Sequence, residues 1–396
     1  MMTRVSKVLV KNRMFLVSLA VLCMVNQRLS ASTVTYQDTA GNQRIYVAAT
    51  GTNNHLLVDR WDGFHWQWYD QGLPAGTTAV YYPAAITYPD LTGDQRIYIF
   101  AIGSNKHLVA NYRTNGNWHW ADYGAAPFGF ALHDRIAAVS YPDSAGNQQI
   151  FVFTTATNDH LTILSGNGTS FHWIDGGKNP GPGLLLNPTA ITYLDTAGVQ
   201  HTCAYLDGND LIEACRNPNG TWTLTDRGVP SGIPEIAIPS AFSFQDDVGA
   251  QEIGIFCMGS NGHLVLDSFD GSSVWSWSDQ YFTGGAGVRG AAWPAAVTYL
   301  DPIDAFQKIY AFVEGGSFGH LVVNYWDGFS WQWADQGLGP NGVADGPKDA
   351  ITYLDATGHQ RIYVFVVGTN HHLLVNYWDG FGWHWADLGN QLSGLH

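Results

Sequence analysis

Short hydrophobic runs separated by polar segments recur along residues 350–389, near the end of the chain. These runs are rich in β-branched and aromatic residues, and turn-forming segments such as Asp379-Gly380 divide them. Glycine adopts the positive φ that a tight hairpin turn requires, so an Asp-Gly pair between two such runs predicts a β-hairpin. The segment therefore predicts a four-stranded antiparallel meander, with strands at Ile351–Tyr353, Arg361–Val367, His372–Trp378 and Trp383–Trp385.

Both faces of this meander are apolar. In the second run, Ile362, Val364 and Val366 alternate with Tyr363 and Phe365, whereas a sheet with one solvated face would alternate apolar with polar residues. One copy alone cannot cover both of its faces. The pattern therefore predicts that several copies stack face to face, as the units of repeat proteins do.

Six earlier segments repeat the same pattern, 51 to 55 residues apart, and every copy carries an Asp-Gly or Asn-Gly turn. This spacing suits a blade better than a short solenoid coil. We therefore predict an all-β fold over residues 32–396, a seven-bladed β-propeller with four antiparallel strands per blade. The sequence leaves open whether an N-terminal strand completes the last blade. The copies begin near Val34, Ile86, Val139, Ile191, Phe242, Val297 and Ala350.

The first 31 residues differ in kind from the repeats. Four basic residues precede an apolar run of about twelve residues, Met14 to Val25, and small residues follow at Ser30 and Ala31. This order predicts a secretory signal peptide over residues 1–31 and a secreted, extracellular protein. The alternative is an uncleaved membrane anchor, but the run is short for a membrane span, which needs about 20 residues.

Charge argues against two classes of partner. The whole chain has a formal net charge of −15, and loss of the predicted signal peptide, with its five basic residues and no acidic one, would make it −20. Such an acidic protein is repelled by nucleic acid and by anionic membrane surfaces. We therefore expect neither nucleic-acid binding nor membrane insertion.

Three cysteines follow the predicted signal peptide. Cys203 and Cys215 lie at equal distances from the turn residue Asn209, so a hairpin would place them opposite each other. Secretion permits a disulfide between them, and two free buried thiols are the alternative. Cys257 lies in a predicted buried strand and is expected to stay free. No Cys or His spacing matches a zinc site, so the sequence predicts no metal and no cofactor.

A His-Leu pair followed by W-x-W-x-D recurs in most copies. Alternate residues of a strand share a face, so both tryptophans of each copy point to one side. Tryptophan faces stack on the C–H-rich faces of sugars, which makes the repeat a set of candidate sugar sites. The alternative is that these tryptophans form inter-blade core. The candidate residues are His55, Trp66, Trp68, His107, Trp118, Trp120, His320, Trp331, Trp333, His372, Trp383 and Trp385.

The runs HLLVNYWDGFGWHWADLG, HLVVNYWDGFSWQWADQG and QRIYVF resemble the seven-bladed propeller lectins of the Photorhabdus type. The resemblance covers about residues 34–389 and is specific in copies 1, 2, 6 and 7, whereas copies 3 to 5 depart from it. It implies a multivalent, non-catalytic lectin that binds L-fucose or O-methylated sugars in pockets between adjacent blades. It also implies a tendency to form homo-oligomers.

Two other functions compete with the lectin interpretation. A propeller glycosidase of the sialidase kind would need an arginine cluster, a nucleophilic tyrosine and a carboxylate pair. Arg44, Arg96 and Arg361 instead occupy equivalent positions of the repeat, and the S-x-D-x-G-x-x-W motif is absent. A protein-interaction scaffold would present one asymmetric apolar patch rather than equivalent pockets. The repeat therefore favours glycans as the partners.

Overall fold

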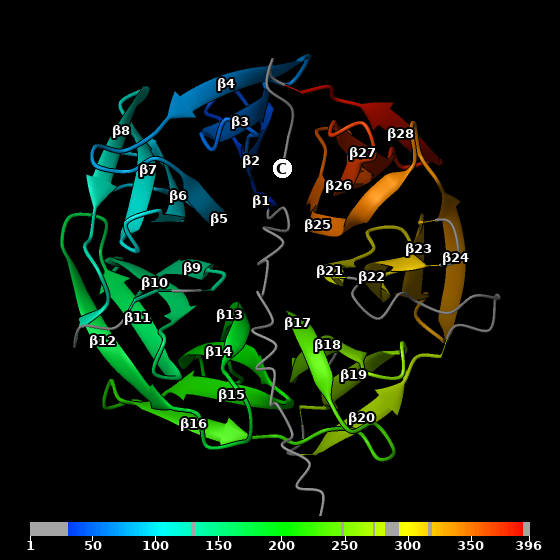
Figure 1. The fold of residues 1–396 in the computed structure, drawn as a ribbon. Helices are drawn as coiled ribbons and strands as arrows, with labels where there is room; N and C mark the ends of the chain where they lie inside the picture. The colour runs from blue at the N-terminus through cyan, green and yellow to red at the C-terminus, as the bar shows by residue number, and fades with distance from the viewer. Residues whose placement is uncertain are drawn as a thin grey trace, which may run out of the picture.

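A computed structural model describes residues 31–127, 131–132, 134–246, 249–271, 274–281, 293–315 and 319–390. Within these ranges the chain forms seven four-stranded antiparallel sheets arranged radially around an axis, as Figure 1 shows. The predicted seven-bladed β-propeller is thus confirmed. The predicted signal peptide falls almost entirely on residues outside the described ranges. No helix in the described ranges is long and apolar enough to cross a membrane.

The first four blades take their strands in chain order from the axis outward. Blade 1 contains β1 (Ala31–Gln37), β2 (Gln43–Thr50), β3 (Leu56–Trp61) and β4 (Trp66–Gly72). Blade 2 contains β5 (Val80–Pro89), β6 (Gln95–Gly103), β7 (Leu108–Thr114) and β8 (Asn117–Asp122). Blade 3 contains β9 (Ala137–Pro142), β10 (Gln148–Thr155), β11 (His160–Gly166) and β12 (Phe171–Lys178). Blade 4 contains β13 (Leu186–Leu194), β14 (Gln200–Gly208), β15 (Asp210–Arg216) and β16 (Trp222–Asp226).

The last three blades follow the same order. Blade 5 contains β17 (Ile236–Gln245), β18 (Gln251–Gly259), β19 (Leu264–Phe269) and β20 (Trp275–Asp279). Blade 6 contains β21 (Ala295–Leu300), β22 (Gln307–Gly315), β23 (His320–Trp326) and β24 (Trp331–Gly337). Blade 7 contains β25 (Val343–Leu354), β26 (Gln360–Gly368), β27 (Leu373–Trp378) and β28 (Trp383–Asp387). Each blade is therefore one copy of the repeat, and none of the described strands is exchanged between blades to close the ring.

The hydrophobic core is divided among the seven blade interfaces. In β26, Ile362, Val364 and Val366 pack against blade 6, while Phe365 and Val367 pack against blade 1. Each of the other interfaces holds an equivalent cluster of buried side chains. The prediction that both faces of each sheet are buried is confirmed, and this packing between blades closes the ring.

Side chains near the axis also link neighbouring blades. The backbone N–H of Ala85 in blade 2 donates to the Ser32 hydroxyl of blade 1, and the N–H of Ala296 in blade 6 donates to Ser240 of blade 5. At the junction of the last and first blades, the N–H of Thr33 donates to the Asp349 carboxylate at 2.6 Å. The inner strands are therefore tied to one another at the point where the sheets come closest.

The repeated arginines bind aspartates in the loop between the first and second strands of their blades. Asp38 accepts the backbone N–H of Asn42 at 2.9 Å and the Arg44 guanidinium at 2.6–2.9 Å. The Asn42 N–H and the guanidinium lower the pKa of Asp38 to about 2. Arg361 makes the same bonds to Asp355. These arginines fix the loops of their own blades, which supports the earlier argument that they are not a substrate-binding cluster.

A buried aspartate interrupts the pattern of the third strands. Asn376 lies level with Trp385 and donates its amide to the His384 carbonyl across the hairpin, and Asn111 and Asn324 do the same in their blades. Blade 1 has Asp59 at this position, with no exposed surface and, within the described residues, no hydrogen-bond partner for either carboxylate oxygen. A carboxylate cannot donate to the opposite carbonyl, and burial raises the pKa of Asp59 to about 7.

The substitution Asp59→Asn should therefore stabilise the protein. The amide would supply the hydrogen bond that three other blades make, and no charge would be buried. We expect a gain on the order of 2–4 kcal/mol in the free energy of unfolding at pH 8. Because the folded state binds the Asp59 proton more tightly than the unfolded chain, wild-type stability should fall as the pH rises from about 4 to about 7. Denaturant unfolding across this range should show the fall, and Asp59→Asn should weaken it. Equal stability of the two proteins at pH 8 would contradict this interpretation.

Candidate functional site

A cavity of about 410 Å³ opens between blades 6 and 7. Tyr299, Tyr310 and Tyr325 of blade 6 form one wall, with successive ring centroids 6.0 and 5.7 Å apart. Trp378 and Trp383 of blade 7 also line the cavity, with centroids 5.8 Å apart. Aromatic rings of both blades thus line the cavity, and the rings of Tyr310 and Trp383 approach each other with centroids 6.3 Å apart. The cavity volume is within the size range of small-molecule sites.

Polar groups surround these rings. Asp301 and Lys308 of blade 6 and His359 and Gln360 of blade 7 line the cavity. The ammonium group of Lys308 donates to Asp304 at 2.7 Å and to a backbone carbonyl, which holds it in place. Burial raises the pKa of Tyr299 and the pKa of Tyr310, so both hydroxyls stay neutral and can donate as well as accept hydrogen bonds. Apolar ring faces with a few fixed polar groups are the arrangement that recognises a sugar ring and its hydroxyls.

The two tryptophans of each W-x-W run have different roles. Trp383 lines the cavity and also packs edge-on against Phe312 of blade 6, with centroids 5.7 Å apart. Trp385 lies beside the cavity, where its indole N–H donates to the Gln336 carbonyl of blade 6 at 2.7 Å. The second tryptophan of other blades makes the same bond to the preceding blade, as Trp68, Trp120 and Trp173 show. It therefore serves mainly to join blades.

The first tryptophans of the other candidate blades pack against rings of the preceding blade. Trp66 meets Phe365 edge-on, with centroids 6.0 Å apart, and Trp331 meets Phe256 at 5.7 Å. Trp118 lies 6.2 Å from the ring of Tyr46. All three remain half-buried, as does Trp333 in the cluster between blades 5 and 6. The inter-blade core interpretation thus applies to these tryptophans at least in part.

The repeated histidines pair with the aspartates of the W-x-W-x-D runs. His372 Nδ1 lies 2.9 Å from Asp387, whose carboxylate also accepts the Gly389 N–H at 2.7 Å. Each pair joins the start of a third strand to the end of a fourth. His320 and His372 do not line the cavity between blades 6 and 7. The six pairs, 2.8–3.0 Å apart, are His55–Asp70, His107–Asp122, His160–Asp175, His263–Asp279, His320–Asp335 and His372–Asp387.

The interface between blades 7 and 1 repeats this set of rings. Tyr353, Tyr363 and Tyr377 stack in blade 7, and Trp61 and Trp66 of blade 1 pack against the same buried cluster. The same aromatic residues therefore occur at two interfaces, one between blades 6 and 7 and the other between blades 7 and 1.

Tyrosine fills the corresponding space between blades 2 and 3. The Tyr98 hydroxyl donates to the Gly168 carbonyl at 2.8 Å. A Cβ added to Gly168 would lie only 2.2 Å from the Tyr88 hydroxyl, so these groups are in close contact. Phe171 replaces the first tryptophan and packs 4.6 Å from Tyr123. The interface between blades 2 and 3 therefore differs from the one between blades 6 and 7. The difference agrees with the sequence, because blade 3 has Phe171 where the repeat has its first tryptophan.

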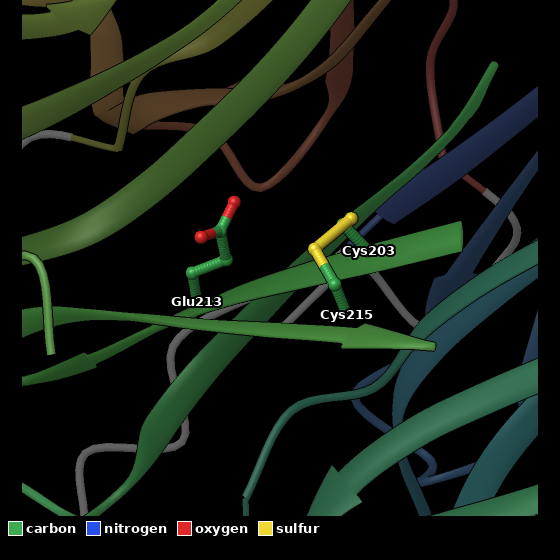
Figure 2. Close-up of side chains that lie close together, drawn as sticks. All are labelled: Cys203, Glu213 and Cys215. Carbon is green, nitrogen blue, oxygen red and sulfur yellow. A yellow bond between two sulfur atoms is a disulfide. The ribbon is translucent and has the colours of Figure 1, made fainter. Parts of the chain in front are cut away.

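Blades 4 and 5 differ again, because a disulfide replaces the tyrosine pair. Cys203 and Cys215 lie opposite each other in β14 and β15 and are bonded, as predicted, and Cys257 is free and buried. Figure 2 shows the Glu213 carboxylate beside the bonded sulfurs. Metal binding requires a thiolate, so this group is not a metal site while the disulfide is intact.

A second cavity, of about 310 Å³, follows the propeller axis. The innermost strands line it with mostly small residues and prolines, and the Arg135 guanidinium lies 3.2 Å above the Trp293 ring. Trp293 is the one tyrosine or tryptophan among its described lining residues, whereas such rings from both blades line the cavity between blades 6 and 7. The inter-blade cavity is therefore the stronger candidate for a sugar site.

Comparisons with known proteins agree with the fold. No protein-family model and no curated protein matches the sequence. Among solved structures, BP39L lectin from Burkholderia pseudomallei is similar to this chain, with a TM-score of 0.67 and 19% identity over 93% of this chain and 99% of that one. AofleA from Arthrobotrys oligospora gives a TM-score of 0.52 and 14% identity over 92% and 87%.

A six-bladed fungal lectin, from Aleuria aurantia, is also similar, with a TM-score of 0.50 and 19% identity. The match covers 78% of this chain and 97% of that lectin, which fits a ring with one blade fewer. At these low identities the likenesses show a shared β-propeller fold. They do not by themselves assign a ligand to this chain.

Proposed function

We propose that the protein is a multivalent lectin that binds saccharides between adjacent blades and does not hydrolyse them. The observation that carries the proposal is the cavity between blades 6 and 7. Its tyrosine and tryptophan walls suit the two faces of a pyranose ring, and its polar residues suit the hydroxyls. Several equivalent sites on one ring would raise the affinity for a surface that carries many glycans.

The proposed ligand is L-fucose or a related, O-methylated sugar. The resemblance of the repeat to propeller lectins favours this ligand. Structures of the Aleuria aurantia lectin support it as well, because one is a complex with α-methyl-L-fucoside. The aromatic walls would contact methyl groups as readily as C–H bonds. We further propose that the protein acts outside the cell after removal of residues 1–31.

A glycan array followed by calorimetric titration tests this function. Fucosylated and O-methylated glycans should bind, and titration with α-methyl-L-fucoside should give more than one site per chain. Incubation with the bound glycans should release no free sugar. An array without any bound glycan would contradict the lectin proposal, and sugar release would favour a glycosidase.

A protein-interaction scaffold is the second candidate, and one observation favours it. Phe64, Phe329 and Phe381 lie in equivalent turns of blades 1, 6 and 7, and 73–77% of each residue's surface is exposed. These three blades are neighbours in the ring. Exposed aromatic residues are frequent at protein interfaces. The control variant described in the Discussion separates this candidate from sugar binding.

A further inference from the structure

Two arginines occupy cavity-lining positions at the interface between blades 1 and 2. Arg60 pairs with Tyr46 across β2 and β3, as Tyr325 pairs with Tyr310 in blade 6. Arg113 pairs with Trp118 across β7 and β8, as Trp378 pairs with Trp383 in blade 7. Because Tyr325 and Trp378 both line the cavity between blades 6 and 7, the two guanidinium groups replace aromatic walls of the equivalent space.

Contacts place both arginines near one tyrosine. Tyr36 corresponds to the cavity residue Tyr299 and stacks on Tyr46, with centroids 6.1 Å apart. The Arg60 guanidinium carbon lies 5.7 Å from the centre of the Tyr46 ring. Burial and Tyr46 raise the pKa of Tyr36, while the positive charges of Arg113 and Arg60 oppose this rise. Both guanidinium groups therefore act on the same tyrosine hydroxyl.

These arginines also lack the partners that other arginines have. Arg44, Arg96 and Arg361 bind aspartates of their own blades, and Arg227 binds Asp267 at 2.8 Å. Within the described ranges, neither Arg60 nor Arg113 forms an ion pair, and the buried Nε of Arg60 has no hydrogen-bond partner. Two half-buried like charges repel each other, and an anion between them would remove that cost. The chain has a net charge of −15, yet none of its described carboxylates pairs with Arg60 or Arg113. We therefore expect an external anion to neutralise these two guanidinium groups.

We propose that the interface between blades 1 and 2 binds an anionic saccharide. Its sulfate ester or carboxylate would lie between the Arg60 and Arg113 guanidinium groups, while its ring would lie against Tyr46 and Trp118. This inference rests on the proposed function, because it assigns one of the inter-blade sites a different class of sugar. Guanidinium groups bind both kinds of oxyanion through paired N–H donors, so the two sources share one recognition chemistry.

Titrations of the full chain with matched sugars test the proposal. The probes are a fucoside, the same fucoside carrying a sulfate ester, glucuronic acid and inorganic sulfate. At low ionic strength the sulfated fucoside or glucuronic acid should bind about tenfold or more tightly than the neutral fucoside, and salt should weaken that preference. The double variant Arg60→Tyr, Arg113→Trp installs the residues of blades 6 and 7 and should lose the preference.

Two further variants make the result decisive. Arg216→Ala removes the arginine equivalent to Arg113 at the interface between blades 3 and 4, where Ser165 stands in place of Arg60. It should keep the preference. If the aromatic double variant fails to fold, Arg60→Gln with Arg113→Gln replaces it.

Equal affinity for charged and neutral sugars would overturn the proposal, as would a preference that survives the double variant. Inorganic sulfate that competes as well as the sulfated sugar would also overturn it, because the site would then recognise only the anion. A third result separates this inference from the proposed function. If the neutral fucoside does not bind but the charged sugar still binds through the two arginines, the proposed neutral sites are wrong and this inference holds.

Discussion

Replacing Trp61, Trp326 and Trp378 together by alanine is expected to weaken fucoside binding at least tenfold at their sites. Each ring pairs across its hairpin with the first tryptophan of its W-x-W run, at centroid distances of 5.5–5.8 Å. Trp378 forms part of the aromatic wall between blades 6 and 7, and Trp61 and Trp326 occupy the equivalent positions of two neighbouring interfaces. Loss of an aromatic stacking surface removes much of the affinity of a site that makes few polar contacts.

The fold should tolerate this triple variant. Other blades carry Arg113, Gly166, Arg216 or Phe269 at the same position, so the tryptophan is not required for a blade to form. The matched control replaces the exposed phenylalanines Phe64 and Phe329 by alanine and should bind as the wild type does. Phe381 is kept, because its ring lies 5.0 Å from that of the cavity residue His359. Calorimetry measures both affinities. Full binding by the tryptophan variant, or loss of binding in the control, would move the site away from the inter-blade cavity.

Phe365→Ala should destabilise the protein by about 3–5 kcal/mol, as expected for the loss of a buried aromatic ring. Phe365 has no exposed surface and packs between blade 7 and blade 1, where Trp66 meets it edge-on. No strand crosses this junction, because β1–β4 and β25–β28 form separate sheets. Side-chain packing, the axial bond to Asp349 and the bond from the Trp68 indole to the Leu388 carbonyl therefore hold the ring closed.

The matched substitution is Phe312→Ala, which removes the equivalent ring from the interface between blades 6 and 7. Denaturant unfolding should give similar losses for both variants, because both interfaces are packed in the same way. A much smaller loss for Phe365→Ala would mean that the junction of blades 7 and 1 contributes little to stability, and closure by packing would then be wrong.

The arrangement of the blades could be predicted from sequence because it depends on alternation. Tyr363 and Phe365 point to one neighbour and Val364 to the other, and seven copies of this pattern require a closed ring. The inner strands were harder to predict. β25 begins at Val343 rather than near Ile351, and its pairing with β26 is interrupted around Pro347. The proline and glycine between Val343 and Ile351 are typical of a linker. In the structure, β-bulges accommodate these residues and the segment stays paired with β26.

The candidate site was predicted only in part. The repeat drew attention to the tryptophans and histidines, and of the predicted residues in blades 6 and 7 only Trp383 lines the cavity. The cavity tyrosines were missed, although each blade 6 tyrosine has a tyrosine counterpart in blade 7. The sequence cannot tell an indole that faces a cavity from one that, like Trp385, donates to a backbone carbonyl, because both lie on the same face of one strand.

The most direct measurement is a crystal structure of the protein grown with α-methyl-L-fucoside. The account predicts a pyranose between blades 6 and 7, with one face on Trp378 or Trp383 and the other toward the tyrosines of blade 6. A sugar bound only along the propeller axis or on the outer strands, with the inter-blade cavity closed by its own side chains, would contradict it.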